Sequence, residues 1–437
     1  MKYCLAIDIG ASGGRHIVGY KENGRIVTEE LYRFPNGMDR VDGHLVWDID
    51  RLLSEVKAGI GIALRKYPSL SSVAIDTWGV DYVLLRGGEA VTPVYAYRDD
   101  RVDRAIEEVH SIIPFAELYD RTGIQFNKFN TVYQLYADKL AGRLEGVDDL
   151  LMIPEYLAYR LTGVKKREYT NATTSSLVNA GTGEYDGYIF DRLGLPRELI
   201  TPLHRPGEPV GHLLPEVAAE VGGDLPVVLC ATHDTASAVE AIEMEADAPY
   251  ISSGTWSLLG VKTERPITDA ASRASGYSNE GGVGYNRYQK NITGMWIVQC
   301  LRRELCPDMP YDEIARMAES SDFCEIFDVN HGSFTAPESM QGAIRAYLSE
   351  RGAAEPESAA DLFNCAYHSL AAGYRDAIAD LEKNAGREYP DIYVVGGGAR
   401  NTYLNALTEK YTGKRVVALP IEATAIGNLK IQLERGE

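Results

Sequence analysis

The stretch Asp8-Ile9-Gly10-Ala11-Ser12-Gly13-Gly14-Arg15 decides the fold, because it places a run of small residues between two apolar segments. The segment before it, Tyr3–Ile9, is apolar, and the segment after it, Arg15–Tyr20, has the composition of a strand. A second turn at Lys21–Gly24 leads into another strand-like segment, Arg25–Phe34. Extended segments joined by short glycine-rich turns are typical of β-hairpins. We therefore expect the chain to begin with an antiparallel meander.

The same loop is a candidate phosphate-binding site. It fails the dinucleotide fingerprint, because its spacing is wrong and a strand follows where a helix should begin. It also fails the P-loop pattern, since no Gly-Lys-Ser/Thr closes it. Its glycines would let backbone N–H groups approach an anion, while Asp8 could hold a divalent cation and Arg15 could face a phosphate. The alternative is an ordinary glycine hairpin.

Further along, the patterns predict alternating helices and strands. We expect a helix over Asp50–Lys66, strands over Val73–Asp76, Tyr82–Leu85 and Leu225–Cys230, and mainly helices from Val102 to Leu161. In the second half we expect a strand–turn–strand unit over Tyr250–Lys262, a long helix over Leu362–Asn384, a strand over Ile392–Val395 and a helix from about Asn401.

The two halves of the chain resemble each other. The segment Ile7–Ser12 has a counterpart in Ile251–Trp256, and each stands at the start of its half. This repetition predicts a duplicated architecture with two domains, residues 1–245 and 246–437.

The charge of the chain excludes some classes of partner. The formal net charge is −19, with 63 acidic residues against 44 lysines and arginines, so nucleic acid would be repelled. The opening apolar run is too short for a signal peptide, and no stretch has membrane-spanning length. We expect a cytoplasmic protein that binds neither nucleic acid nor membrane, as a monomer or a homodimer.

A strand-to-helix junction at Cys230–Val239 carries Asp234. As a helix N-cap, Asp234 would accept a backbone N–H and face the positive end of the helix dipole. Junctions of this kind also hold reactive groups in α/β proteins, where an aspartate could accept a proton from a substrate hydroxyl. His233 could be a core residue or a sugar contact, and both interpretations remain open.

The segment Ile75–Asp81 combines two carboxylates, a hydroxyl and an indole around Gly79. Sugar sites favour this mixture, since carboxylates accept from hydroxyls and an aromatic face packs on C–H groups. A β-turn with aspartates facing solvent is the alternative.

A triple-glycine segment, Val395–Asn401, leads into a predicted helix. Such a loop allows close approach of an anionic ligand at the helix N-terminus. A simple strand-to-helix loop is the alternative.

Taken in order, these motifs resemble those of the FGGY carbohydrate kinases along essentially the whole chain. The matching segments are AIDIGASGGR, RFPNG, VWDID, IDTWGVDYVLL, AYRDDR, TGIQFNKFNT, EYTNATT, THDTASAV, YISSGTWSL, KNITGMW, YVVGGGARN and EATAIGN. Three of them, IDTWGVDYVLL, EYTNATT and THDTASAV, favour the members that phosphorylate L-rhamnulose over those for xylulose or glycerol.

The resemblance implies an α/β protein with a two-lobed, actin-like (ribonuclease H-like) ATPase fold, mixed sheets and a ligand cleft between the lobes. It implies transfer of phosphate from ATP, with Mg²⁺, to the C1 hydroxyl of L-rhamnulose. L-Fuculose, D-xylulose and an inactive binding protein are the alternatives. The chain ends nine residues after Asn428, so we expect the second domain to be shortened.

The resemblance also assigns site residues. Asp234 would be the catalytic base, and Asp8 would lie near Mg²⁺. The expected sugar contacts are Gly79, His233, Thr235, Asn291, Asp76 and Trp78. The expected nucleotide contacts are Ala11, Ser12, Gly13, Gly14, Arg15, Thr255, Gln299 and Gly397. Two positions depart from the family pattern: Glu155 stands where Asp is usual, and Gly13 stands where Ser is common.

Overall fold

The computed structural model describes residues 1–244, 247–419 and 422–435. The chain forms two compact units. The first unit comprises Met1–Ala241, Thr263–Arg287 and Ala423–Glu437, and the second comprises Ile242–Lys262 and Tyr288–Glu422. The predicted domain border between residues 245 and 246 lies outside the described residues and stays a prediction.

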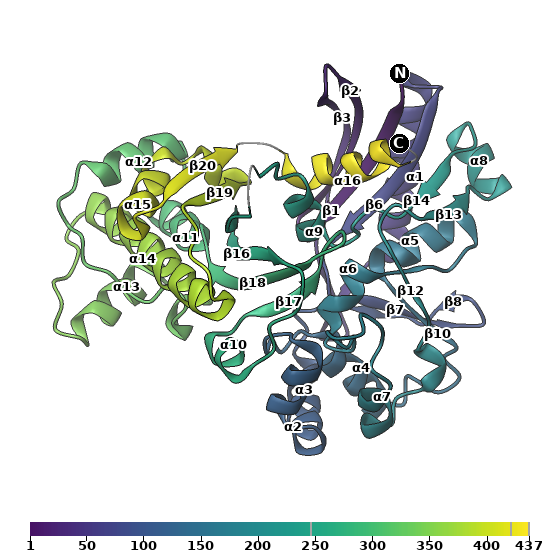
Figure 1. Ribbon diagram of the computed structural model, residues 1–437, viewed down its shortest axis with the longest axis horizontal. Helices are drawn as coiled ribbons and strands as arrows, with labels where there is room; N and C mark the ends of the chain where they lie inside the picture. Colours follow the sequence, from purple (N-terminus) through teal and green to yellow (C-terminus); the bar gives the residue numbers. More distant parts are fainter. Residues whose placement is uncertain (245–246, 420–421, 436–437) are drawn as a thin grey trace. The chain divides into compact units, whose positions relative to one another are not determined.

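The first unit contains a six-stranded mixed sheet in the order β13-β14-β6-β1-β2-β3 (Figure 1). Its strands are β1 (Tyr3–Gly10), β2 (Gly13–Glu22), β3 (Arg25–Pro35), β6 (Leu70–Thr77), β13 (Pro209–His212) and β14 (Pro226–Val228). Strand β1 pairs antiparallel with β2 and parallel with β6. The predicted opening meander is confirmed. Its first turn is only Ala11-Ser12, because Gly13 and Gly14 already belong to β2.

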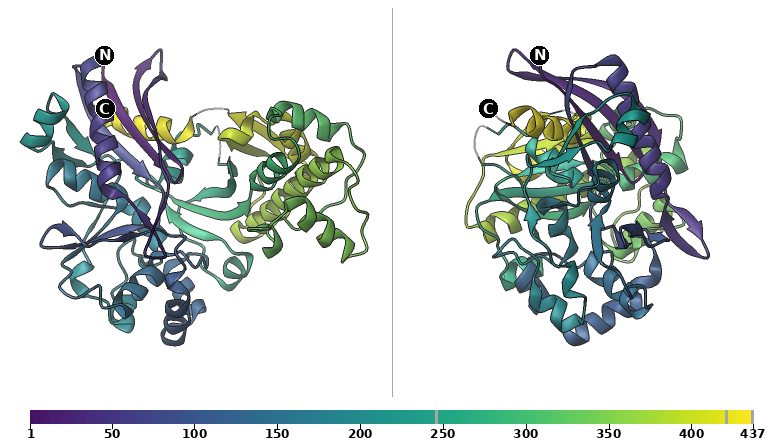
Figure 2. Two further views of the ribbon diagram at one scale, coloured as in Figure 1. Left: turned by 180° about the vertical axis from the view of Figure 1, so that it is seen from behind. Right: turned by 90° about the vertical axis from the view of Figure 1, so that its right-hand side faces the viewer.

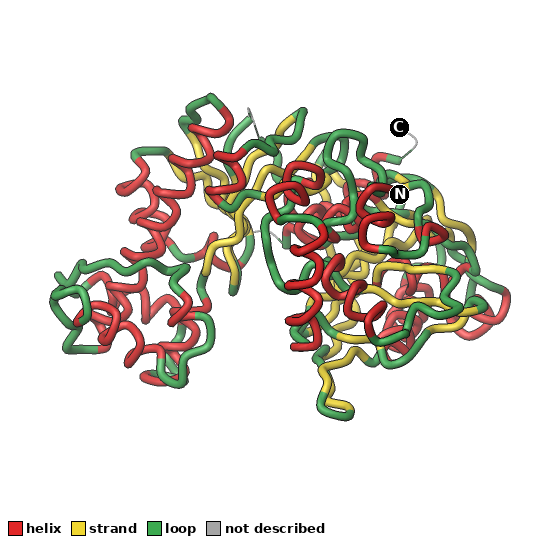
Figure 3. Tube along the Cα trace, turned by 90° about the horizontal axis from the view of Figure 1, so that it is seen from below, coloured by secondary structure: helices red, strands yellow, loops and turns green. Residues whose placement is uncertain are grey.

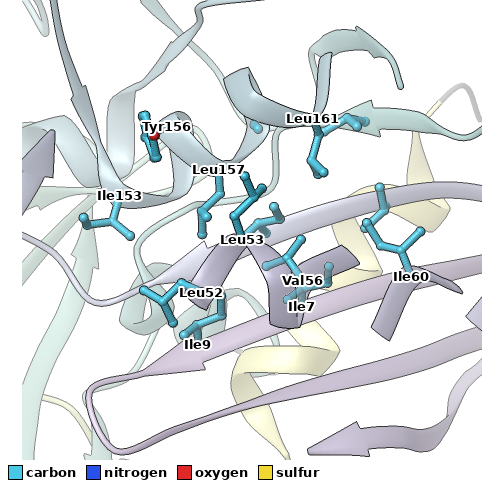
Figure 4. Close-up of a cluster of buried hydrophobic side chains, with 14 of the residues drawn as sticks. Ile7, Ile9, Leu52, Leu53, Val56, Ile60, Ile153, Tyr156, Leu157 and Leu161 are labelled. Carbon is cyan, nitrogen blue, oxygen red and sulfur yellow. The ribbon is translucent and has the colours of Figure 1, made fainter. Parts of the chain in front are cut away.

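The alternation of side chains along β1 separates the two faces of this sheet. Leu5, Ile7 and Ile9 lie in the core that also contains residues of helices α1 (Ile49–Lys66) and α5 (Ile153–Thr162). Figure 4 shows the side chains of Ile7 and Ile9 beside those of Leu52 and Val56 of α1. The residues of opposite parity, Cys4 and Ala6, pack instead with helix α16 (Ala423–Glu434). By the same parity Asp8 faces the α16 side of the sheet.

Helix α16 returns from the end of the chain to the first sheet, beside β1 (Figures 1 and 2). It also packs closely on α9 (Asp234–Glu240), because a Cβ at Gly427 would stand 1.7 Å from the Ser237 carbonyl oxygen. Only a residue without a side chain permits this approach. The glycine of the EATAIGN segment is therefore a packing requirement.

The remainder of the first unit consists of short strands and helices, several of which surround a second core. The strands are β4 (Asp39–Val41), β5 (His44–Trp47), β7 (Tyr82–Arg86), β8 (Glu89–Ala90), β9 (Val94–Tyr95), β10 (Asp149–Met152), β11 (Arg167–Glu168), β12 (Leu203–His204) and β17 (Ser278–Gly281). The helices are α2 (Asp103–Ile112), α3 (Phe115–Thr122), α4 (Thr131–Leu140), α6 (Tyr169–Ala172), α7 (Gly187–Leu193), α8 (Pro215–Val221) and α10 (Ala270–Ser275).

The second unit repeats the plan of the first. Its strands β18 (Asn286–Thr293), β16 (Trp256–Thr263), β15 (Tyr250–Ser253), β19 (Asp391–Val395) and β20 (Arg415–Leu419) are neighbours in that order. Strand β15 is antiparallel to β16 and parallel to β19, as β1 is to β2 and β6. The predicted duplication and the α/β class with mixed sheets are both confirmed.

Helices make up most of the rest of the second unit (red in Figure 3). They are α11 (Trp296–Leu305), α12 (Tyr311–Glu319), α13 (Met340–Ser349), α14 (Ala359–Ala385) and α15 (Thr402–Thr412). The predicted helices at Leu362–Asn384 and from Asn401 are confirmed as α14 and α15. Within the described ranges, no helix is both long and apolar enough to cross a membrane.

Candidate functional site

Two aspartates lie side by side at the carboxyl ends of the parallel strands β1 and β6. Asp8 and Asp76 are register partners, and Arg15 is the partner of Asp8 on the other side, in β2. The Arg15 guanidinium donates to an Asp8 carboxylate oxygen at 2.6 Å. Ligands of open α/β sheets bind outside the carboxyl ends of parallel strands. This edge is therefore the natural place for a charged ligand.

Asp76 is a fully buried carboxylate that has one satisfied oxygen and one orphaned oxygen. The Asn428 side-chain amide on α16 donates to its Oδ2 at 2.6 Å. Its Oδ1 has no hydrogen-bond partner among the described residues. Burial, and then the charge of Asp8, raise the pKa of Asp76 well above its usual value. An orphaned buried carboxylate oxygen beside a second carboxylate suits a bound cation or water.

Asp234 is the first residue of α9, with His233 as the N-cap. One carboxylate oxygen accepts from the Thr235 backbone N–H at 2.6 Å, and 29% of the side chain remains exposed. Burial raises the pKa of Asp234, His233 lowers it and the charge of Asp8 raises it. A partly exposed carboxylate with a raised pKa is able to accept a proton from a hydroxyl near neutral pH. The alternative interpretation of Asp234 as the helix N-cap is wrong, because His233 occupies that position and Asp234 lies one residue inside the helix.

A buried arginine organises the residues on either side of Asp234. The Arg287 side chain has no exposed surface; its guanidinium contacts the His233 ring at 3.1 Å and donates to the Thr235 hydroxyl at 3.1 Å. It also donates to the Glu280 carboxylate at 3.0 Å, and that carboxylate lies 3.2 Å from the His233 ring. The polar atoms of His233 and Thr235 are therefore fixed before any ligand arrives.

The loop before Asp234 is held by a second buried carboxylate, that of Glu168. This side chain is fully buried and accepts five hydrogen bonds, two of them from Thr232. The Thr232 carbonyl in turn accepts from the Thr77 backbone N–H at 2.9 Å and from the Asn171 side chain at 3.2 Å. The junction that carries Asp234 is thus tied to the end of β6.

Contacts with buried side chains of the first unit fix the segment Ile75–Asp81. A Cβ at Gly79 would meet the Thr174 side chain at 2.9 Å, so this glycine allows a close approach. The Trp78 indole is buried against Trp47, with ring centroids 4.2 Å apart, and its N–H donates to Asp81 at 2.9 Å. The indole expected to pack on a sugar thus lies in the protein core, and its sugar contact stays a prediction.

The first hairpin turn, Ala11-Ser12, is braced by Asn36. The Asn36 amide donates to the Gly10 carbonyl at 2.9 Å, and its backbone N–H donates to the Ser12 carbonyl at 3.2 Å. A Cβ at Gly14 would stand 2.1 Å from the nearest atom of the Phe34 ring, which explains why this position has no side chain. Across the turn, Gly13 is the register partner of Gly10. The turn is a fixed, small-residue surface suited to a phosphate.

In the second unit, the expected nucleotide contacts Thr255 and Gly397 follow β15 and β19, and Gln299 lies on α11. The Thr255 hydroxyl, in the turn between β15 and β16, donates to Gln299 on α11 at 3.3 Å. Gly397 follows β19 and has open space where a Cβ would stand, whereas a Cβ at Gly398 would strike Ser253 at 1.9 Å. Asn291, the remaining expected sugar contact, lies half-buried on β18.

The structure thus brings together Asp8, Arg15 and Asp76, and separately joins His233 with Thr235 and Thr255 with Gln299. Sequence reasoning missed the four residues that hold these groups in place: Glu168, Glu280, Arg287 and Asn428. Glu168 and Asn428 lie in the segments EYTNATT and EATAIGN, which were recognised without a role for them. Among the described residues, no group of three or more His, Cys, Asp or Glu side chains could hold a metal by itself.

Comparison with known families shows a match along nearly the whole chain. Residues 3–240 match the N-terminal domain of the FGGY family of carbohydrate kinases. Residues 249–433 match the C-terminal domain of the same family.

Similar sequences and similar folds come from carbohydrate kinases. A rhamnulokinase of Oceanobacillus iheyensis is 43% identical over 438 residues, which cover 99% of this chain and 93% of the relative. A rhamnulokinase of Bacillus subtilis is 40% identical, covering 98% and 89%. A xylulose kinase from Lactobacillus acidophilus has a similar fold, with a TM-score of 0.83 and 16% identity over 100% of this chain and 89% of that one. A glycerol kinase from Plasmodium falciparum has a TM-score of 0.77 with 13% identity, covering 99% and 89%.

Proposed function

Because this chain belongs to the FGGY family of carbohydrate kinases, we propose that it transfers the γ-phosphoryl group of ATP to the C1 hydroxyl of L-rhamnulose. The products are L-rhamnulose 1-phosphate and ADP. The observation that carries the proposal is Asp234, a carboxylate with a raised pKa at the start of α9, between His233 and Thr235. The names of relatives at 40% and 43% identity support the choice of sugar.

In this mechanism Asp234 acts as the general base. Phosphoryl transfer passes through a loose transition state, so the enzyme mainly positions its substrates and neutralises charge. Asp234 orients the C1 hydroxyl toward the γ-phosphorus and accepts its proton as the new O–P bond forms. The bond to ADP breaks in the same step. A carboxylate whose pKa is raised toward the working pH is a better proton acceptor than an ordinary one.

The residues at the ends of β1 and β6 fit a Mg²⁺ ion. Mg²⁺ prefers oxygen ligands and is usually held by one or two carboxylates together with waters and substrate phosphates. Asp8 and Asp76 are adjacent carboxylates, and Oδ1 of Asp76 has no partner among the described residues. When bound, the ion would neutralise phosphate charge. Asp8 would hold it, and Asp76, whose raised pKa favours the protonated form, would add negative charge only on losing its proton to the solvent.

The two hairpin turns are the proposed phosphate contacts. Ala11, Ser12, Gly13 and Gly14 present a turn of small residues, and Arg15 adds a positive charge that is partly offset by Asp8. Thr255, Gln299 and Gly397 are the proposed nucleotide contacts of the second unit. Backbone donors matter here, because the net charge of −19 disfavours a polyphosphate at long range.

The sugar would be recognised by groups that are already fixed. His233 and Thr235 are held by Arg287, so their polar atoms need no rearrangement. A site built to bond hydroxyl groups rejects sugars that place them elsewhere, since its own buried groups would then lack partners. Gly79, Asn291, Asp76 and Trp78 complete the proposed set. We place this reaction in the cytoplasm, which supplies ATP.

The test is an assay that couples ADP release to NADH oxidation, with Mg·ATP and L-rhamnulose, L-fuculose, D-xylulose, glycerol or no sugar. ADP release with L-rhamnulose at a kcat/KM at least tenfold above the other sugars is the expected result. A preference for another ketose would support the kinase activity but contradict the proposed substrate. Release that does not depend on any sugar would overturn the proposal.

A further inference from the structure

The first unit contains a pocket lined by arginines, which the proposed reaction does not use. Its volume is about 280 Å³. We call it the arginine pocket; its lining residues with polar side chains are His44, Tyr95, Arg101, Arg104, Asp138 and Arg143. They come from β5, β9, the 3-10 helix Asp100–Val102, the start of α2, and α4 with the turn after it. None of them belongs to the proposed sugar or nucleotide contacts.

Arg101 is the least satisfied of these groups. Only 10% of its side chain is exposed, yet its guanidinium reaches Gln134 at no less than 3.4 Å and Asp138 at 3.7 Å. Its Nε has no hydrogen-bond partner among the described residues. A buried guanidinium offers five donors, and long contacts leave most of that capacity unused. A ligand with several acceptor oxygens would supply what the protein does not.

Tyr95 holds the guanidinium groups in place. The Arg101 and Arg143 guanidinium carbons lie 4.4 Å and 4.7 Å from the centre of the Tyr95 ring. Such cation–π contacts fix the plane of a guanidinium without using its N–H donors. Arg143 also donates to the carbonyls of Pro93, Val91 and Thr92, at 2.7, 3.4 and 3.5 Å. The Arg101 donors are therefore pre-oriented at the pocket, and Arg143 contributes mainly its positive charge.

The pocket lining carries a net positive charge. Asp138 is its one carboxylate, and it already accepts from the Tyr82 hydroxyl at 2.6 Å and pairs with Arg143 at 2.9 Å. Arg104 is exposed and pairs with Glu108 at 2.8 Å on α2. The lining thus has three guanidinium groups and one carboxylate, whereas the whole chain has a net charge of −19.

We propose that the arginine pocket binds a phosphate group, either as inorganic phosphate or as a phosphomonoester such as a sugar phosphate. Planar guanidinium groups pair with phosphate oxygens through two parallel hydrogen bonds, which a single ammonium cannot do. Arg101 provides the buried contact, Arg143 a positive charge beside it, and Arg104 the exposed contact. The pocket is a second anion site, independent of the proposed phosphate contacts at the hairpin turns.

Protection from phenylglyoxal, which modifies arginine side chains, locates the site without any substitution. The full chain is treated in inorganic phosphate, in glucose 6-phosphate, or in chloride of equal ionic strength, and modified peptides are quantified by mass spectrometry. The expected result is at least threefold slower modification of Arg104 and Arg143, with Arg316 unchanged. Protection by inorganic phosphate alone would identify the free ion as the ligand. Protection by glucose 6-phosphate alone would identify a phosphomonoester as the ligand. Equal rates in all three solutions would overturn the proposal.

Two matched variants measure the contribution of the pocket to binding. Arg104 and Arg316 are both exposed and both pair with a carboxylate four residues away on a helix. By calorimetry, R104Q should weaken the binding of the protecting anion by roughly 3- to 5-fold, as expected for one exposed charge contact, while R316Q should leave it unchanged. Equal affinities of R104Q and R316Q would overturn the proposal.

Discussion

Glu168 and Thr232 form a two-point contact in the protein interior: one carboxylate oxygen of Glu168 accepts both the backbone N–H of Thr232, at 3.0 Å, and its hydroxyl, at 2.8 Å. The residue after Thr232 is His233, and the next is Asp234. The contact therefore sets the position of the proposed base through two peptide units. Glu168 is a positioning residue in this reading, since it does not touch the reacting atoms.

Glu168→Ala should lower turnover about 10- to 100-fold, because it removes the acceptor of five hydrogen bonds at once and frees the loop. Glu168→Gln should recover most of the activity. Four of the five bonds go to Oε2, and a single amide oxygen can take that place. The measurement is steady-state kcat with L-rhamnulose. It is made at a temperature at which circular dichroism shows that each variant is folded. Equal loss in both variants would contradict the positioning role.

Asp234→Asn should lower kcat about 100-fold or more while sugar affinity stays within a few-fold of the wild type. The amide keeps the size of the side chain but cannot accept the proton. Binding is measured by calorimetry with L-rhamnulose and kcat by the coupled ADP assay. Near-normal turnover would remove Asp234 from the mechanism.

Asn428→Ala should raise the Mg²⁺ concentration needed for half-maximal activity, by roughly tenfold for each unit of pKa change at Asp76. The Asn428 amide favours the ionised form of Asp76, so its loss raises the pKa of Asp76 further. Activity is titrated with Mg²⁺ at saturating ATP. Asn384→Ala, which removes an amide that donates to Tyr288 in the second unit, is the control and should leave the titration unchanged.

Gly427→Ala should lower the free energy of unfolding by about 1–3 kcal/mol, the usual cost of overpacking. The new methyl group would meet the Ser237 carbonyl, which is backbone and cannot rotate away. Gly332→Ala is the control, because that glycine has open space around it. Urea unfolding followed by circular dichroism measures both. Equal stabilities would show that α16 can shift without cost.

Glu155 predicts a pH dependence of stability. Burial raises the pKa of Glu155 to about 8 in the folded protein, against a usual value near 4.5. The folded state therefore holds a proton that the unfolded state has lost, so stability is full below about pH 4.5 and falls as pH rises toward 8. The slope approaches 1.4 kcal/mol per pH unit.

Glu155→Gln should flatten this dependence between pH 5 and 8, although it also loses one of the hydrogen bonds from Met152 and Glu168. Urea unfolding at several pH values compares the slopes of the two proteins. Parallel curves would assign the ionisation to another group.

Local pattern was sufficient to predict the central strands of each sheet, but it did not predict β13, β18 or β20. The opening meander, the helix at Asp50–Lys66 and the second hairpin near Gly254 follow from periodicity and turn residues, which act over a few positions. The hairpin pairing of Asp8 with Arg15 follows from the same short-range geometry. The segment Ile75–Asp81 shows the limit: local pattern did not predict that the Trp78 indole packs on Trp47, from another strand, and its sugar contact stays a prediction.

The residue types of the site are a property of the sequence, whereas their assembly is a property of the tertiary fold. Asp8 meets Asp76 only because β1 and β6 are parallel neighbours joined by a crossover. Asn428 reaches Asp76 across 352 positions because α16 packs on the sheet, and Arg287 reaches His233 across 54. No short-range pattern encodes these contacts, since loop closure over such distances is favourable only when whole hydrophobic faces are buried at the same time.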